Sequence, residues 1–415
     1  MKKRFGCYSK ILNNKNYIKF AAGSIVSGFG DVFQFIAVTT LLVRITGTGL
    51  SAGFIVLCTP IASLLFSAIA GIIGDRVNQK KTVILFDLMK GLTAFVFILC
   101  HDTNTIYLLM VILASLEVLY TPPHKKLMIG ILGKNDIIKG NSLLNVLAGF
   151  VFAAGPVLAG FIIFYYGVKI CFIFNGLSFL FSAAVTVLIG NEANIPTSHS
   201  SYRVKNSFIL DLITGLKHIY NNVPLKKIIT VTTVVCFTGT AINTAFYPYA
   251  FDILRVTERG WGFMMSLFYG TNIAALLVPV FKERKNIDAS IILITVPLFV
   301  LSTVWFGYGV FKGMGAVLLL QIFEGTAACL FWVYAGSLIQ ILPAKAYTAR
   351  IIGINELINN LGKLAGICFA YVILYVLSIK YIFLISSAVI FLFTLCVSTR
   401  IVESKPRIIC KTTNA

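Results

Sequence analysis

Long apolar runs constrain this chain more than any other feature. A helix needs about 20 apolar residues to cross a bilayer, and twelve segments of about that length follow one another. They fall at 18–43, 50–74, 82–100, 105–122, 142–166, 169–190, 227–251, 261–281, 288–310, 314–342, 350–376 and 379–400. The runs are continuous rather than alternating, so helices are favoured over a β-barrel. We therefore expect an all-α integral membrane protein with twelve transmembrane helices.

The placement of charge predicts the orientation. Charged residues make up only 12% of the chain, and the net charge of +20 gathers at the ends of the apolar segments. Lysine and arginine dominate alternate connections, on the side that the N-terminus shares, which predicts that both termini are cytoplasmic. Because no soluble basic domain carries the charge, we expect no nucleic-acid partner. The expected location is a plasma membrane, in a bacterial source given the abundance of Lys, Ile and Asn.

The long connection at 191–225 divides the chain into two halves of six segments each. Apolar residues at 209, 212, 213, 216, 219 and 220 keep helical spacing there, which predicts an amphipathic helix on the inner leaflet. We expect domains at 1–190, 191–225 and 226–415. Asn141 and Asn145 open span 5 as Asn355 and Asn359 open span 11, the positions that a six-helix repeat would match.

Polar residues within the apolar runs are candidates for proton coupling or substrate binding, because such groups are costly in a membrane. In span 1, Asp31 and Gln34 continue a polar stripe that begins at Ser24 and Ser27. The full set of candidates is Asp31, Gln34, Glu117, Glu324, Glu356, Lys363, Asn145 and Asn359.

Structural roles remain open for several of these residues. Asp31 could be bonded to a neighbouring helix, Glu117 could pair with a loop lysine such as Lys125, and Glu356 could form a static ion pair with Lys363.

Motifs of soluble enzymes are not evident. Gly130-Ile-Leu-Gly133-Lys134 is too short for a phosphate-binding loop, and the four histidines are dispersed. We therefore expect a protein that is not an enzyme, with no cofactor and no metal. The expected partners are the lipid bilayer, a small-molecule substrate and protons, and we expect a monomer.

Three motifs carry a resemblance to the major facilitator superfamily. Gly71-x-x-x-Asp75-Arg76, followed by Lys80, resembles the loop between helices 2 and 3 of that superfamily. Ser27-Gly-Phe-Gly30-Asp31 looks like the opening of its macrolide-efflux and siderophore-exporter branch. Gly155-Pro156-x-x-x-Gly160 is similar to the antiporter motif of span 5. The chain departs from the family where Asn78-Gln79 replaces Gly-Arg.

The resemblance implies a fold, a mechanism and roles for these motifs. The fold would be two six-helix bundles related by a pseudo-twofold axis. The activity would be export of a small hydrophobic, drug-like or macrolide-like compound by proton antiport with alternating access. Gly71, Asp75, Arg76 and Lys80 would form a conformational gate, and Gly155, Pro156 and Gly160 the antiporter motif. An exporter of a metabolite, peptide or siderophore shares these motifs. The glycine-proline motif of span 5 disfavours an importer, and a channel or membrane enzyme is the alternative of a different class.

Overall fold

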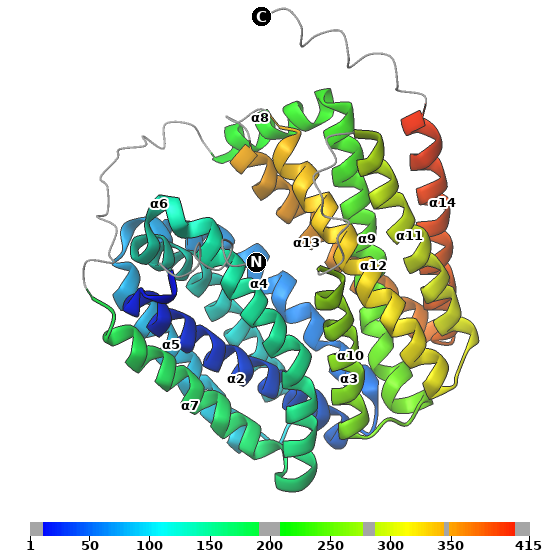
Figure 1. Cartoon of the computed structure of the whole chain (residues 1–415). Helices are drawn as coiled ribbons and strands as arrows, with labels where there is room; N and C mark the ends of the chain where they lie inside the picture. Colours follow the sequence, from blue (N-terminus) through cyan, green and yellow to red (C-terminus); the bar gives the residue numbers. More distant parts are fainter. Residues whose placement is uncertain (1–10, 191–207, 277–286, 344–347, 403–415) are drawn as a thin grey trace, which may run out of the picture. The chain divides into compact units, whose positions relative to one another are not determined.

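The computed structural model describes residues 11–190, 208–276, 287–343 and 348–402 (Figure 1). Every regular element in these ranges is a helix, which confirms the all-α prediction. Large apolar side chains lie exposed along many of the helices, among them Leu92, Leu99 and Phe150. An apolar surface of this extent is typical of a protein that faces lipid.

The first part of the chain forms helices α2 to α7. Their bounds are α2 (Lys15–Thr46), α3 (Gly49–Gly53), α4 (Ile55–Arg76), α5 (Gln79–Val96), the short η1 (Phe97–Leu99), α6 (Thr103–Tyr166) and α7 (Val168–Val187). Helix α2 packs on α6 and α7, α4 packs on α6, and α5 packs on α6 and α7. The helix that carries the polar stripe of span 1 is therefore packed between α6 and α7.

The remaining helices follow residue 207. Their bounds are α8 (Phe208–Asn221), α9 (Val223–Pro248), the π-helical turn η3 (Tyr249–Ile253), α10 (Glu258–Leu276), α11 (Ile287–Val310), α12 (Met314–Ile341), α13 (Thr348–Val376) and α14 (Lys380–Val402). Helix α11 packs on α12 and α14, and α8 packs on α13. The amphipathic helix predicted in the long connection is present as α8.

Internal contacts divide the chain into two compact units. Unit 1 comprises Met1–Tyr202 together with Phe246–Gly270, and unit 2 comprises Arg203–Ala245 together with Thr271–Ala415. The end of α9, the turn η3 and most of α10 thus pack with the N-terminal helices. The predicted domains at 1–190, 191–225 and 226–415 follow the order of the spans along the chain and stay a prediction.

Nine helical segments in the described ranges are long and apolar enough to cross a membrane, and two shorter apolar helices accompany them. The predicted spans 105–122 and 142–166 both lie in α6, which supplies two of the nine, Thr103–Leu132 and Leu143–Tyr166. The connection between them is therefore helical rather than a loop. The predicted span 261–281 runs into residues outside the described ranges, so the total of twelve stays a prediction.

Local sequence sets where α2 begins and ends. The Asn14 side chain accepts hydrogen bonds from the backbone N–H groups of Asn16 and Tyr17, which caps the first turn. Gly47 ends the helix in the left-handed conformation, at φ 70°, that glycine adopts without strain. Thr48 then caps the short helix α3.

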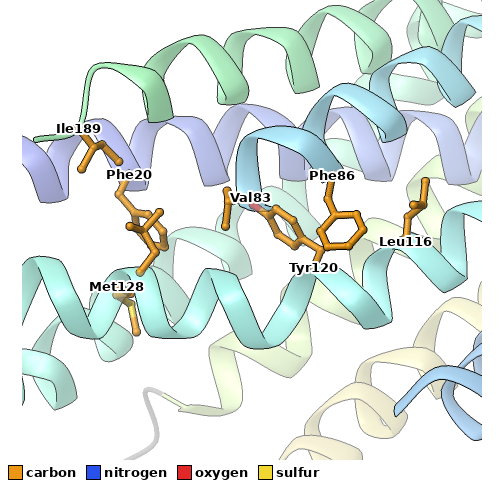
Figure 2. Close-up of a cluster of buried hydrophobic side chains, with 8 residues drawn as sticks. Phe20, Val83, Phe86, Leu116, Tyr120, Met128 and Ile189 are labelled. Atoms are coloured by element: carbon orange, nitrogen blue, oxygen red, sulfur yellow. The ribbon is translucent and has the colours of Figure 1, made fainter. Parts of the chain in front are cut away.

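A cluster of buried apolar side chains joins α2, α5 and α6 (Figure 2). Its members are Phe20, Val83, Phe86, Leu116, Tyr120, Leu127, Met128 and Ile189. Tyr120 belongs to this cluster and also contacts the charged residues described next. The cluster therefore fixes one aromatic wall of the candidate site.

Candidate functional site

Four ionisable side chains come together in unit 1. Asp31 lies on α2, Asp87 and Lys90 lie one turn apart on α5, and Glu117 lies on α6. The charges of Lys90, Glu117 and Asp87 all act on Asp31. We call these four residues the charged cluster.

Lys90 is the centre of this charged cluster. Its side chain is 3% exposed, and its ammonium forms an ion pair with the Glu117 carboxylate. The ammonium also lies 3.8 Å from the centroid of the Tyr120 ring and 5.2 Å from that of Phe179. A buried charge needs such partners, because its desolvation costs several kcal/mol.

The three carboxylates differ in access. Asp87 is fully buried, and its Oδ2 accepts a hydrogen bond of 2.8 Å from the Ser182 hydroxyl on α7. Its Oδ1 has no hydrogen-bond partner among the described residues. The Asp31 side chain is exposed, and that of Glu117 is 55% exposed although its partner is buried. The charged cluster therefore combines two accessible carboxylates with a buried lysine and a buried aspartate.

His124 lies two helical turns beyond Glu117 on α6. Its ring stacks on Phe20 at 4.4 Å and on Tyr120 at 4.8 Å between centroids. Its Nε2 lies 3.1 Å from the Ser24 hydroxyl. The polar stripe predicted on span 1 thus meets α6 at Ser24 and the charged cluster at Asp31.

Gln34, the last residue of that stripe, is buried between α2 and α7. The Asn175 amide donates a hydrogen bond to the Gln34 side-chain carbonyl. The backbone of α2 comes close to Asn175 and Ser178 at Gly30, where a Cβ would collide with both side chains. This part of the stripe holds two helices together.

Glu324 is a candidate residue of unit 2 whose two carboxylate oxygens both accept hydrogen bonds from side chains. Its Oε1 accepts a hydrogen bond of 2.9 Å from Trp305 Nε1, and its Oε2 accepts one of 2.7 Å from the Tyr308 hydroxyl. Both donors are neutral and lie one turn apart on α11. The carboxylate is therefore held by hydrogen bonds alone in the described surroundings.

Among the described residues no ion pair joins Glu356 to Lys363, and the role of this pair stays a prediction. Lys363 donates a hydrogen bond of 3.3 Å to the Asn360 side chain instead, and Glu356 is exposed. Glu356 lies seven residues before Lys363 on α13, whereas Asn360 lies only three residues before it. The shorter separation brings Asn360 within reach of the lysine.

The paired asparagines of the two halves differ in environment. Asn359 is buried and accepts a hydrogen bond of 3.3 Å from Thr233 on α9, whereas Asn145 on α6 is exposed. Asn355 likewise accepts one of 3.2 Å from Thr232. Asn359 thus holds two helices of unit 2 together.

The predicted gate motif is described only in part. Gly71, Asp75 and Arg76 lie at the end of α4, and their side chains lie outside the described residues. The Lys80 ammonium donates a hydrogen bond of 2.6 Å to the Ile189 carbonyl, just after α7. Asn78, which departs from the family pattern, caps α5 by accepting from Lys81 N–H.

The predicted antiporter motif on α6 makes close backbone contacts within unit 1. A Cβ at Gly155 would lie 2.8 Å from Val32 Cγ1 on α2, and a Cβ at Gly160 would lie 2.8 Å from the Glu258 carbonyl. The Pro156 carbonyl abuts Gly262 on α10, and Val157 N–H donates a 3.0 Å hydrogen bond to Ser266. The small residues thus permit tight packing of α6 against α2 and α10.

Polar contacts also join residues 246–270 to the N-terminal helices of unit 1. Arg44 forms an ion pair of 2.6 Å with Glu258. Asp252 accepts hydrogen bonds of 2.7 Å from the Thr48 hydroxyl and 2.8 Å from Gly49 N–H.

Comparison with known proteins decides the family. The profile of the Major Facilitator Superfamily matches residues 20–284, which is more than half of the chain. The chain belongs to the Major Facilitator Superfamily (MFS). The MFS-type transporter YfmI of Bacillus subtilis (strain 168), itself uncharacterized, is 22% identical over 344 residues, covering 80% of this chain and 83% of that protein.

Solved structures share the MFS fold at low sequence identity. The nucleoside transporter NupG superposes with a TM-score of 0.72 at 13% identity, over 93% of this chain and 99% of its own. The POT family transporter PepTSo has a TM-score of 0.71 at 12% identity, over 94% and 99%. The protein is therefore a multi-pass MFS transporter, and the fold confirms the superfamily resemblance.

Sequence reasoning missed three residues of the charged cluster and its surroundings: Asp87, Lys90 and His124. Asp87 and Lys90 lie inside the predicted span 82–100, so the cost of an ionisable group in a membrane was a signal that could have found them. His124 could not be found from spacing, because its partner Ser24 lies a hundred residues away. Glu117 pairs with Lys90 rather than with the nearby Lys125.

Proposed function

We propose that this MFS transporter exports a small hydrophobic compound, drug-like or macrolide-like, in exchange for protons. The charged cluster carries this proposal. The cluster holds three carboxylates and a single lysine, so with all of them ionised it would carry two uncompensated negative charges within membrane-spanning helices. A bound proton, or a cationic group on the substrate, would compensate such charge.

The accessible carboxylates are the proposed exchange sites. A proton that enters on one side of the membrane would bind Asp31 or Glu117, and its release on the other side would restore the negative charge. Protonation of Glu117 would weaken its ion pair with Lys90, which couples the proton to the packing of α5 against α6. Inward movement of one proton through 100 mV releases about 2.3 kcal/mol.

Export by alternating access rests on the family motifs. Gly155, Pro156 and Gly160 support the antiporter assignment, and Asp75 and Arg76 would latch one state of the cycle on the cytoplasmic side. The opening motif that ends at Asp31 supports the macrolide-efflux and siderophore-exporter branch. We further propose a monomer with both termini in the cytoplasm.

Drug accumulation in cells tests the proposal. Wild type, Asp31→Asn and Glu117→Gln would be expressed at matched levels in a host lacking its own efflux pumps. We expect wild type to lower the accumulation of a labelled macrolide and a lipophilic cationic dye. A protonophore, Asp31→Asn or Glu117→Gln should each remove most of this effect.

Asp102→Asn is the matched control. Asp102 lies outside the spans and accepts a hydrogen bond of 2.8 Å from Thr105 N–H, a capping role that asparagine fills equally well. It should export as wild type does. Export that continues after the proton gradient collapses would contradict proton coupling.

A different substrate class is the second candidate function. NupG is a nucleoside transporter that shares this fold, so the fold is compatible with endogenous polar metabolites. If wild type does not lower the accumulation of any drug or dye, export of a metabolite, peptide or siderophore becomes the favoured function. Flux that neither saturates nor depends on a gradient would point to a channel instead.

A further inference from the structure

The junction of α8 and α9 in unit 2 carries a shallow depression on its surface. Its volume is about 470 Å³, and its lining residues are Leu216, Lys217, Ile219, Tyr220 and Lys226. Tyr220 is 71% exposed and Leu216 is 43% exposed. The depression therefore offers an uncovered apolar wall, and we call it the α8 depression.

Basic side chains flank this apolar wall. Lys217 and Lys226 are both exposed, and no carboxylate is among the lining residues. The Lys226 ammonium lies 4.4 Å from the centroid of the Tyr220 ring. An aromatic face and a nearby ammonium hold each other in place by a cation–π interaction, so the rim is preorganised for an anion.

The chain places the α8 depression at the level of a membrane surface. The candidate span Val223–Ile253 begins two residues after α8 ends at Asn221. Lysine and tyrosine side chains at such a boundary present an apolar body to lipid and a polar tip to water. A phospholipid has the matching arrangement, with a polar headgroup next to an apolar acyl chain.

We propose that the α8 depression is a binding site for one anionic phospholipid. The acyl chain lies against Leu216 and Tyr220, and the phosphate lies between Lys217 and Lys226. Because α8 packs on α13 in the same unit, the bound lipid secures α8 to the membrane surface beside its helical neighbour. The loop charges predict that this is the cytoplasmic surface.

Lipid retention by the purified full-length protein tests this site. Native mass spectrometry would count the phosphatidylglycerol or phosphatidylcholine molecules that the protein retains during titration. We expect wild type to hold one phosphatidylglycerol that Lys217→Ala/Lys226→Ala binds roughly thirtyfold more weakly, at about 1 kcal/mol for each lysine. Phosphatidylcholine binding should not distinguish the two proteins.

Lys380→Ala supplies the matched control. Lys380 is also exposed and lies 5.1 Å from the ring of Tyr381, but it does not line the α8 depression. It should retain phosphatidylglycerol as wild type does. Lys217→Arg/Lys226→Arg should retain it too, because both substitutions keep the positive charge. Tyr220→Ala should weaken binding while Tyr220→Phe should not.

Three outcomes would overturn the proposal. The first is equal retention of phosphatidylglycerol by wild type and Lys217→Ala/Lys226→Ala. The second is an equal loss in Lys380→Ala, which would make the effect one of net charge. The third is displacement of the lipid by millimolar inorganic phosphate, which would show a site for free phosphate rather than for a lipid.

Discussion

Lys90 keeps its charge in the interior of unit 1 because several groups share the compensation. The Glu117 carboxylate supplies the ion pair, and the Tyr120 and Phe179 rings supply negative faces. Asp87 and Asp31 add further negative potential. Removing the lysine would leave these carboxylates uncompensated, which costs more than the ion pair itself contributes.

Lys90→Met should therefore lower stability by about 3–5 kcal/mol, the usual effect of leaving a buried charge without compensation, here that of Asp87. Adding Glu117→Gln should recover part of the loss, since one of the uncompensated carboxylates is then gone. Thermal unfolding of the purified protein measures both. Lys125→Met, an exposed lysine on the helix of Glu117, should change stability by less than about 0.5 kcal/mol. A similar loss in Lys90→Met and Lys125→Met would contradict the compensation argument.

Glu258 makes the stability of unit 1 depend on pH. Burial alone would raise the pKa of this carboxyl, but the hydrogen bond and charge of Arg44 outweigh it and hold the pKa below its ordinary value. The unfolded chain then binds the proton more readily than the folded one. The stabilisation is present above the ordinary pKa of about 4.3 and is lost as the pH falls through the lower folded value.

The expected difference is small because Arg44 is 47% exposed. Glu258→Gln should lower stability at pH 7 by less than about 1 kcal/mol. The gap between wild type and variant, measured by thermal unfolding, should narrow between pH 5 and pH 3. A gap that is constant with pH would mean that the ion pair contributes nothing.

At the scale of elements, the apolar runs predicted where helices exist but not where each one ends. Hydropathy reports where lipid gives way to water, whereas a helix continues for as long as its backbone hydrogen bonds are satisfied. Helix α6 therefore passes through Pro122 and Pro123 and onward between its two apolar parts. The sequence also could not predict which side chains on different helices are partners. Lys90 meets Glu117 because α5 packs on α6, and not because the two residues are close in sequence.

The packing of α6 against α2 depends on Gly155. Because a Cβ there would lie 2.8 Å from Val32 Cγ1, Gly155→Ala should lower stability by about 1–3 kcal/mol through overpacking. Val32→Ala in the same protein should relieve part of this cost. Thermal unfolding would compare these with Gly336→Ala on α12, where a Cβ meets open space.

Gly336→Ala is expected to be neutral or slightly stabilising, because alanine favours the helix by up to about 1 kcal/mol over glycine. If Gly155→Ala behaved in the same way, α2 and α6 would not be in the close contact described here.

At the scale of the whole molecule, the candidate residues of the two halves lie in different chemical surroundings. The charged cluster of unit 1 includes an ion pair, whereas Glu324 in unit 2 is held by two neutral donors. The asparagines that match in sequence also differ in their surroundings, since Asn359 is buried and Asn145 is exposed. Residues that match between the halves in sequence therefore need not have matching surroundings in the fold.

The lysines and arginines predict the orientation of the whole molecule in the membrane. Their excess in the connections that share a side with the N-terminus predicts that Lys81 is cytoplasmic and Lys312 is external, and both side chains are exposed. A membrane-impermeant maleimide should label Lys312→Cys in intact cells, above the background of wild type. It should label Lys81→Cys only after the membrane is permeabilised. The opposite pattern would invert the orientation, and the direction of transport with it. Equal labelling of both in intact cells would contradict the arrangement of spans between α5 and α12.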